Sequence, residues 1–213
     1  MNDSFDLYRY TSIPALLYLL SEEKLLLSNP KSWADRTDVD FLEKYAGNDE
    51  EVRALCFFQS EESNLYWELY AKQGCLIQFD KEKLIANFQK KGFRHNPVEY
   101  IKQLEFGRME LESKDIPFVK QYRYRKEDEY RLIWKGSKKE AEKNISIHIN
   151  LDSIKKIVIS GNIEKDEFKS LKEIINGIIE KKIIDKKIES PITVSHSRIF
   201  RNIVLINKAG AKK

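Results

Sequence analysis

Two glutamates spaced two residues apart, Glu127 and Glu129, are the strongest candidates for chemistry in this sequence. They begin the segment 127–134, in which alternating residues predict a β-strand. On a strand, residues two apart share a face, so both carboxylates would project together, about 7 Å apart. Carboxylates held among cations can stabilise a developing sugar cation and orient a ribose hydroxyl. The spacing alone is a weak indicator, because a charged surface strand also produces it.

A basic and aromatic stretch surrounds the two glutamates. Residues 118–139 have a local net charge of +5, and Tyr122, Tyr124, Tyr130 and Trp134 are interspersed among the cations. Cations mixed with stacking rings are typical of sites for single-stranded nucleic acid or a dinucleotide. The candidates for nucleic-acid contacts are four basic residues, Arg123, Arg125, Lys126 and Arg131. The alternative is that the rings belong to the core and the cations only solvate a surface.

Other chemistries find little support in the sequence. It has no Gly-rich phosphate loop, no nucleophile elbow and no zinc-binding helix motif. The three histidines are far apart, so we expect no metal site. Cys56 and Cys75 lie in apolar runs and are interpreted as reduced, buried thiols. The remaining alternatives are a glycosidase-like enzyme or a nuclease, and the absence of a clustered carboxylate or histidine set argues against the nuclease.

The composition predicts a packed protein in the cytoplasm with no membrane partner. The chain has 213 residues, of which 41% are hydrophobic, and a net charge of +4. That charge is too small to identify a polyanionic partner by itself. No apolar run approaches the roughly 20 residues that span a bilayer, and the first residues do not resemble a signal peptide.

The N-terminal part predicts a strand, a helix and a second strand that position these groups. Residues 7–10 alternate as in a strand, Ser12 caps the following helix, and residues 25–27 form the next strand. Pro30 ends that strand, and a polar loop is predicted as far as Asp38. We interpret 41–51 as a loop or short helix and expect a single helix with a break over 103–122.

The rest of the chain alternates between short strands and helices. Further strands are predicted at 52–58, 75–79, 98–101, 127–134, 145–149, 154–160 and 192–206, and further helices at 64–71, 81–90 and 165–182. This order predicts an α+β fold: a single catalytic domain over 1–208, with a central sheet of short strands flanked by helices, and a flexible tail at 209–213.

Several motifs, taken in order, resemble a bacterial family that is often encoded near phage-defence genes. They are Tyr8-Arg9-Tyr10, the loop Trp33–Asp38, Trp67 with Tyr70 and Ala71, Gly74 with Phe79, and Glu127–Leu132. The loop departs from the family pattern, because Ala34, Arg36 and Thr37 replace its Asn, Pro and Phe. More distantly, the order of elements resembles the ADP-ribosyltransferase superfamily, which includes toxins that modify DNA and RNA.

The second resemblance implies an ADP-ribosyltransferase-like fold and NAD as the substrate that donates ADP-ribose. It implies that Glu129 is the catalytic carboxylate on the ribose 2′-hydroxyl and that Glu127 positions the acceptor. It also implies a set of NAD-binding residues: Tyr8, Arg9, Tyr10 and Thr11 at the ribose or phosphates, Ser28 and Asn29 at the ribose, and Trp33, Trp67 or Tyr70 stacked on the nicotinamide. No metal is implied.

Two hypotheses of different classes follow. The first is an NAD-dependent ADP-ribosyltransferase toxin of a toxin–antitoxin or abortive-infection system, which transfers ADP-ribose to nucleic acid, with RNA favoured, and is restrained by a partner antitoxin. The second is a non-enzymatic nucleic-acid-binding or regulatory module, in which the glutamates only form surface ion pairs.

Overall fold

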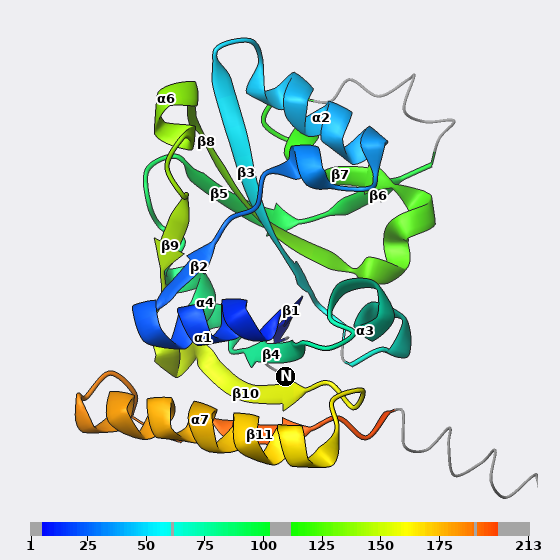
Figure 1. The fold of residues 1–213 in the computed structure, drawn as a ribbon. Coiled ribbons are helices and arrows are strands. Elements are labelled where there is room, and N and C mark those ends of the chain that lie inside the picture. Colours follow the sequence, from blue (N-terminus) through cyan, green and yellow to red (C-terminus); the bar gives the residue numbers. More distant parts are fainter. Residues whose placement is uncertain (1–5, 61, 103–111, 190, 200–213) are drawn as a thin grey trace, which may run out of the picture. The chain divides into compact units, whose positions relative to one another are not determined.

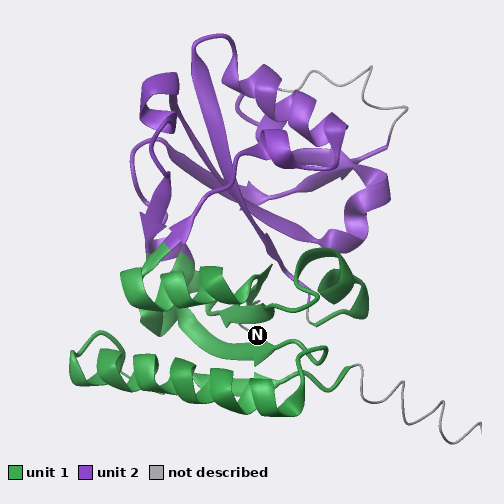
Figure 2. Ribbon diagram, in the orientation of Figure 1, with its two compact units in different colours: residues 1–24, 61–84, 149–213 green, residues 25–60, 85–148 purple. Residues whose placement is uncertain are grey.

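The computed structural model describes residues 6–60, 62–102, 112–189 and 191–199 (Figure 1). Its helices and strands belong to an α+β fold, as the sequence predicts. The chain divides into two compact units, each built from separate stretches of sequence (Figure 2). Unit 1 comprises residues 1–24, 61–84 and 149–213, and unit 2 comprises 25–60 and 85–148. Whether 1–208 act as one catalytic domain stays a prediction, and the predicted tail lies outside the described residues.

The described part of unit 1 contains four strands and helices that pack on them. The strand order is β11-β10-β4-β1, and the bounds are β1 (Leu7–Thr11), β4 (Cys75–Phe79), β10 (Ile154–Ile159) and β11 (Thr193–His196). Strand β4 is antiparallel to both neighbours, whereas β10 and β11 are parallel, so the sheet is mixed. The helices are α1 (Ile13–Glu22), α3 (Asn64–Tyr70), α4 (Lys81–Ala86), which begins in this unit, and α7 (Lys165–Ile184); a 3-10 turn, η4 (Leu151–Ser153), precedes β10.

Local sequence signals in unit 1 predict the structure well. The Ser12 side chain accepts a hydrogen bond from the Ala15 amide and caps α1, and Pro14 lies in the first turn, where its missing N–H breaks no helical bond. In α7, Ile175 and Ile179 are four residues apart and both are buried, as helical periodicity requires. Strand β4 has the bounds that its apolar run predicts.

Unit 2 is built on three antiparallel strands in the order β3-β8-β5. Their bounds are β3 (Glu50–Phe58), β5 (Phe93–Pro97) and β8 (Glu129–Ser137). Two pairs of short strands accompany them: β2 (Lys24–Leu26) with β9 (Ser146–His148), and β6 (Glu99–Ile101) with β7 (Val119–Gln121). Among the described residues of this unit, the helices are α2 (Arg36–Ala46) and α6 (Lys138–Ala141), with 3-10 turns η1 (Pro30–Ser32), η2 (Ile116–Phe118) and η3 (Tyr122–Glu127).

The polar loop predicted as far as Asp38 is in part a helix. The Asp35 side chain accepts a hydrogen bond from the Thr37 amide and caps α2, which continues to Ala46. Val39, Leu42 and Tyr45 are spaced three residues apart and are buried. Packing of these side chains therefore stabilises a helix that the polar composition of the segment did not predict. Asp38 therefore lies in the first turn of α2 and is buried.

The prediction for strand β8 was right about the strand and wrong about its faces. The alternation assigned Glu129, Arg131 and Ile133 to a solvent face, but all three are buried. Helix α2 covers this side, because Leu42 and Tyr45 share a hydrophobic cluster with Ile133 and with Val52 and Ala54 of β3. Glu127 precedes the strand, in η3.

The broken helix predicted over 103–122 is absent from the part that the structure describes. Residues 103–111 lie outside the described residues, and 116–122 form η2, β7 and the start of η3. Pro117 removes a helical hydrogen bond at this point, which favours the short turn over a continuous helix. Strand β5, which pairs with β8, was not predicted.

Two glycines give a test of the packing in unit 1. A Cβ on Gly74 would lie 2.1 Å from the carbonyl oxygen of Thr11, whereas a Cβ on Gly177, within α7, would meet nothing within 4 Å. We expect Gly74→Ala to destabilise the fold by roughly 1–3 kcal/mol, because backbone must move. We expect Gly177→Ala to stabilise it by about 1 kcal/mol through helix propensity. Chemical denaturation measures both, and equal effects would contradict the packing around Gly74.

Candidate functional site: a buried ionic cluster in unit 2

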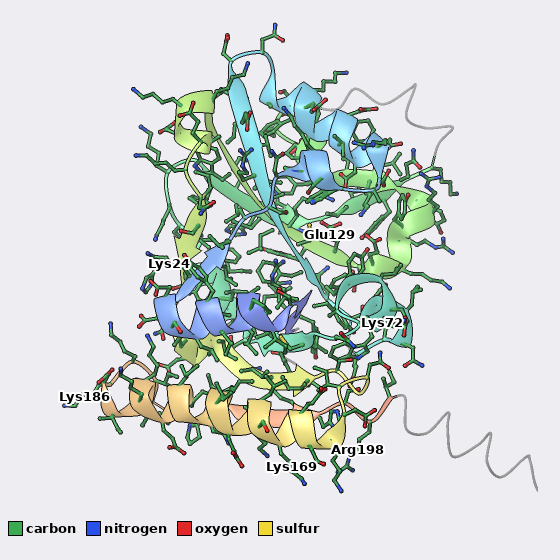
Figure 3. The ribbon with its side chains drawn as sticks, in the orientation of Figure 1. Lys24, Lys72, Glu129, Lys169, Lys186 and Arg198 are labelled. Carbon is green, nitrogen blue, oxygen red and sulfur yellow. The ribbon has the colours of Figure 1, made fainter. Side chains whose placement is uncertain are left out.

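Strand β8 carries two charged residues into the interior of unit 2. Arg131 is 0% exposed and Glu129 is 3% exposed, and Figure 3 labels Glu129 among the strands of this unit. The Arg131 Nε donates to Glu129 Oε1 at 2.7 Å, and its Nη2 donates to Glu129 Oε2 at 3.0 Å. Isolated buried charges cost several kcal/mol, so this paired geometry compensates both groups.

Helix α2 adds a second carboxylate to the same arginine. Asp38 receives hydrogen bonds from Nη1 and Nη2 of Arg131, both at 2.9 Å, although the two residues are 93 positions apart. The Pro117 carbonyl accepts a further bond from Nη1. Arg131 thus joins β8, the first turn of α2 and η2, and every nitrogen of its guanidinium has a partner.

Lys120 of β7 brings a second cation to the carboxylates. Its Nζ lies 2.6 Å from Glu127 Oε2, 3.3 Å from Glu129 Oε2 and 3.6 Å from Asp38 Oδ2. We call these five residues the ionic cluster: Asp38, Lys120, Glu127, Glu129 and Arg131. It has three carboxylates and two cations, and Lys120 and Glu127, with 10% and 14% of their side chains exposed, form its outer edge.

The cluster changes how its members titrate. Burial alone would raise the pKa of Glu129, but the charges of Arg131 and Lys120 lower it to about 2. Burial would lower the pKa of Lys120, but Glu129, Asp38 and Glu127 raise it above its ordinary value. The thiol of Cys56, a half-buried residue on the facing strand, has a raised pKa because its surroundings desolvate it and because it lies beside Glu129. Glu129 is therefore ionised and Cys56 neutral at neutral pH.

The loop that leads into α2 supports the cluster. Trp33 is half-buried, and the guanidinium of Arg131 lies 5.4 Å from the centre of its ring, which is a cation–π contact. The indole Nε1 donates to the Ser28 hydroxyl, and that hydroxyl donates to the Ala54 carbonyl. Asn29 caps η1 through the Lys31 amide. Of the predicted NAD-binding residues in unit 2, only Trp33 touches the cluster.

A short basic and aromatic segment, Tyr122–Lys126, lies next to the cluster in sequence and in space. The guanidinium of Arg125 lies 4.4 Å from the centre of the Tyr122 ring, and that of Arg123 lies 4.7 Å from the Tyr124 ring. Lys120 lies 5.0 Å from the Tyr124 ring and so contacts both the segment and the cluster. Tyr122, Arg123, Arg125 and Lys126 are exposed. Of the four predicted nucleic-acid contacts, the buried Arg131 does not face solvent.

The other predicted NAD-binding residues belong to unit 1. Tyr10 and Trp67 are buried and pack edge to face, with ring centres 5.2 Å apart. The Tyr10 hydroxyl accepts from the Ser63 amide, and the Trp67 indole donates to Glu62. In this structure both rings are packed in the unit, whereas Tyr70 is 46% exposed. Tyr8, Arg9 and Thr11 are half-buried on β1.

Sequence reasoning missed Asp38 and Lys120 as members of the site. The loop that ends at Asp38 belongs to the motifs that resemble the bacterial family, but nothing in the local sequence pattern indicated that the carboxylate of Asp38 is buried. Lys120 contributed only to the positive charge of the stretch 118–139. The Glu-x-Arg alternation at 129 and 131 was the available signal, because two opposite charges on one strand face can pair.

Comparison with models of protein families, with curated proteins and with solved structures found no match. Among the described helices, none is both long and apolar enough to cross a membrane. Within the described ranges, no three or more His, Cys, Asp or Glu side chains are grouped to hold a metal ion.

Proposed function

We propose that this protein is an NAD-dependent ADP-ribosyltransferase that modifies nucleic acid, with the ionic cluster of unit 2 as its catalytic centre. One observation carries the proposal: the two segments Trp33–Asp38 and Glu127–Leu132, which the motifs had indicated, meet around largely buried carboxylates that are paired with Arg131 and Lys120. Strongly perturbed, desolvated ionisable groups are concentrated at functional sites. A preorganised carboxylate is the group that stabilises a developing ribosyl cation.

Glu127 is the carboxylate that the sugar meets in this proposal. Its side chain is 14% exposed at the outer edge of the cluster, against 3% for Glu129. Lys120, at 2.6 Å, holds the carboxylate of Glu127 in place. Glu129 remains the second member of the catalytic pair. Its carboxylate keeps Lys120 protonated and orients the Lys120 side chain. Nicotinamide leaves as the C1′–N bond breaks, and the acceptor then attacks C1′ and loses its proton.

The segment Tyr122–Lys126 binds the acceptor in this proposal. Its rings and guanidinium groups offer stacking surfaces for bases and positive charge for phosphates. RNA is the favoured acceptor. The NAD-binding roles of Tyr8, Arg9, Tyr10, Thr11 and the other residues stay predictions, as do a toxin–antitoxin or phage-defence setting and a restraining antitoxin.

The decisive experiment supplies NAD labelled in its adenylate part to the purified protein together with separate pools of RNA, single-stranded DNA and protein. We expect the wild type to transfer label to nucleic acid and to release nicotinamide. Glu127→Gln should lower the transfer rate about a hundredfold, because a neutral amide does not stabilise the developing cation. Its binding to single-stranded RNA should stay within twofold of the wild-type value.

Glu173→Gln is the matched control, because this exposed glutamate lies on α7 in unit 1. It should transfer label at the wild-type rate. If nicotinamide were released but no label were transferred to any pool, the protein would be an NAD hydrolase and not a transferase. No release at all by the wild type would overturn the enzymatic proposal.

A second function, a non-enzymatic nucleic-acid-binding module, is favoured by one specific observation. Both oxygens of Glu129 are bonded to Arg131, and one also faces Lys120, which is the arrangement of a structural ion network. In that case the protein binds single-stranded RNA through Tyr122–Lys126 and consumes no NAD. The same assay separates the two functions, because only the transferase releases nicotinamide.

A further inference from the structure

Unit 2 also has a concave site whose lining includes no member of the ionic cluster. It is a cavity of about 460 Å³ lined by η1, the C-terminal end of α2, the start of β3 and α6. Figure 1 shows α2 and α6 beside β3, and the contacts between these elements agree with the view. We call it the α2–β3 cavity. Its volume falls in the range of small-molecule pockets, about 300–1,000 Å³.

The charges around the α2–β3 cavity are unequally compensated. The acidic residues Glu51 and Glu50 are ion-paired, the first with Arg53 at 2.6 Å and the second with Lys135 at 2.9 Å. Lys31, Lys44 and Lys138 also line the cavity, and none of the three forms an ion pair with a described residue. Glu43 is the one other acidic residue in the described lining. A positive excess therefore faces the cavity.

The charges of Lys31 and Lys138 both act on the carboxylate of Glu51. The pKa of Glu51 is lowered, first by its hydrogen bond from Arg53 and further by the charges of Lys31 and Lys138. Lys31 comes from η1 and Lys138 from the first turn of α6, so two segments distant in sequence place positive charge near the Glu51 carboxylate, which lines the cavity. Pro30, Leu42 and Val52 form the apolar floor of the cavity, and all three are buried.

We propose that the α2–β3 cavity binds a nucleotide, with its phosphates at Lys31 and Lys138 and its base over the floor of Pro30, Leu42 and Val52. Unpaired lysines gain more from a phosphate than from water and dilute counterions, and an apolar floor favours a planar base over a free inorganic anion. The site shares no residue with the ionic cluster, so the inference does not rest on the proposed transferase activity.

The test measures binding of ADP to the full chain by isothermal titration calorimetry, with inorganic pyrophosphate and adenosine as separate arms. We expect ADP to bind more tightly than either pyrophosphate or adenosine. Added salt should weaken ADP binding, because it screens the charges of the lysines. The double variant Lys31→Ala/Lys138→Ala should weaken ADP binding at least tenfold and adenosine binding by less than twofold.

The charge-preserving variant Lys31→Arg/Lys138→Arg should bind ADP within threefold of the wild type. Lys165→Ala/Lys181→Ala is the matched control, because it removes two exposed lysines from α7 in unit 1. Equal affinity of the wild type and the Lys31→Ala/Lys138→Ala variant, or no ADP binding by the wild type, would overturn the proposal. If pyrophosphate bound as tightly as ADP, the cavity would recognise only the anion, and this result would contradict the proposed contact between the base and the apolar floor. Nicotinamide release from NAD remains a separate measurement that tests the catalytic proposal.

Discussion

Arg131→Met should lower the free energy of unfolding by about 3–5 kcal/mol, one of the two largest effects that we expect in this protein. The substitution keeps a long side chain but removes the cation that pairs with Glu129 and Asp38, at a position where the arginine has no solvent exposure. Two buried carboxylates would then share only Lys120. Urea denaturation, followed by circular dichroism, measures the loss.

The matched control is Arg123→Met, because Arg123 has 63% of its side chain exposed and lies 4.0 Å from its acidic partner, Asp35. Exposed pairs of this kind contribute at most about 1 kcal/mol. A triple variant, Asp38→Leu/Glu129→Leu/Arg131→Met, should recover part of the loss, because it removes the unpaired charges as well. Equal effects of Arg131→Met and Arg123→Met would contradict the buried network.

Glu129→Gln should remove a large part of the sensitivity of the fold to acid. The pKa of Glu129 is about 2 in the folded chain against 4.5 for the free group. Because the unfolded chain takes up this proton first, the stabilisation is present above about pH 4.5 and is lost as the pH falls towards 2. A shift of this size corresponds to about 3 kcal/mol. The wild type should therefore lose its advantage over Glu129→Gln across that window.

The measurement is the free energy of unfolding of both proteins at a series of pH values between neutral and about 2. Glu173→Gln, at an exposed position on α7, should follow the wild-type curve throughout. A difference between wild type and Glu129→Gln that does not change with pH would contradict an ionised, paired Glu129. The result is independent of whether the protein consumes NAD.

Elements with strong local signals could be predicted from the sequence. The Ser12 cap and the apolar run after Pro14 predict α1, and the spacing of isoleucines predicts α7. These elements depend on neighbours within four residues along the chain, which a sequence shows directly. The Asp35 cap of α2 uses the same chemistry, but its polar helix is stabilised by packing on β3, which a sequence does not show.

The candidate site could be predicted only in part, for the same reason. Glu127 and Glu129 were identified from their spacing, and Arg131 from its charge. Their surroundings depend on pairs remote in sequence, such as Asp38 with Arg131, and on α2 covering a strand face whose pattern indicates solvent exposure. Alternation distinguishes two faces of a strand, but it does not show whether the polar face is buried against other charges.

The ionic cluster also constrains how the sequence can diverge. Its five charges compensate one another at contact distance, so the effects of substitutions within it are strongly non-additive. Replacing one member alone leaves buried charges unpaired and costs the most stability, whereas exchanging several together for apolar residues costs less. Descendants of this chain should therefore keep the five residues Asp38, Lys120, Glu127, Glu129 and Arg131 together or lose them together, and this co-variation would help to recognise distant relatives.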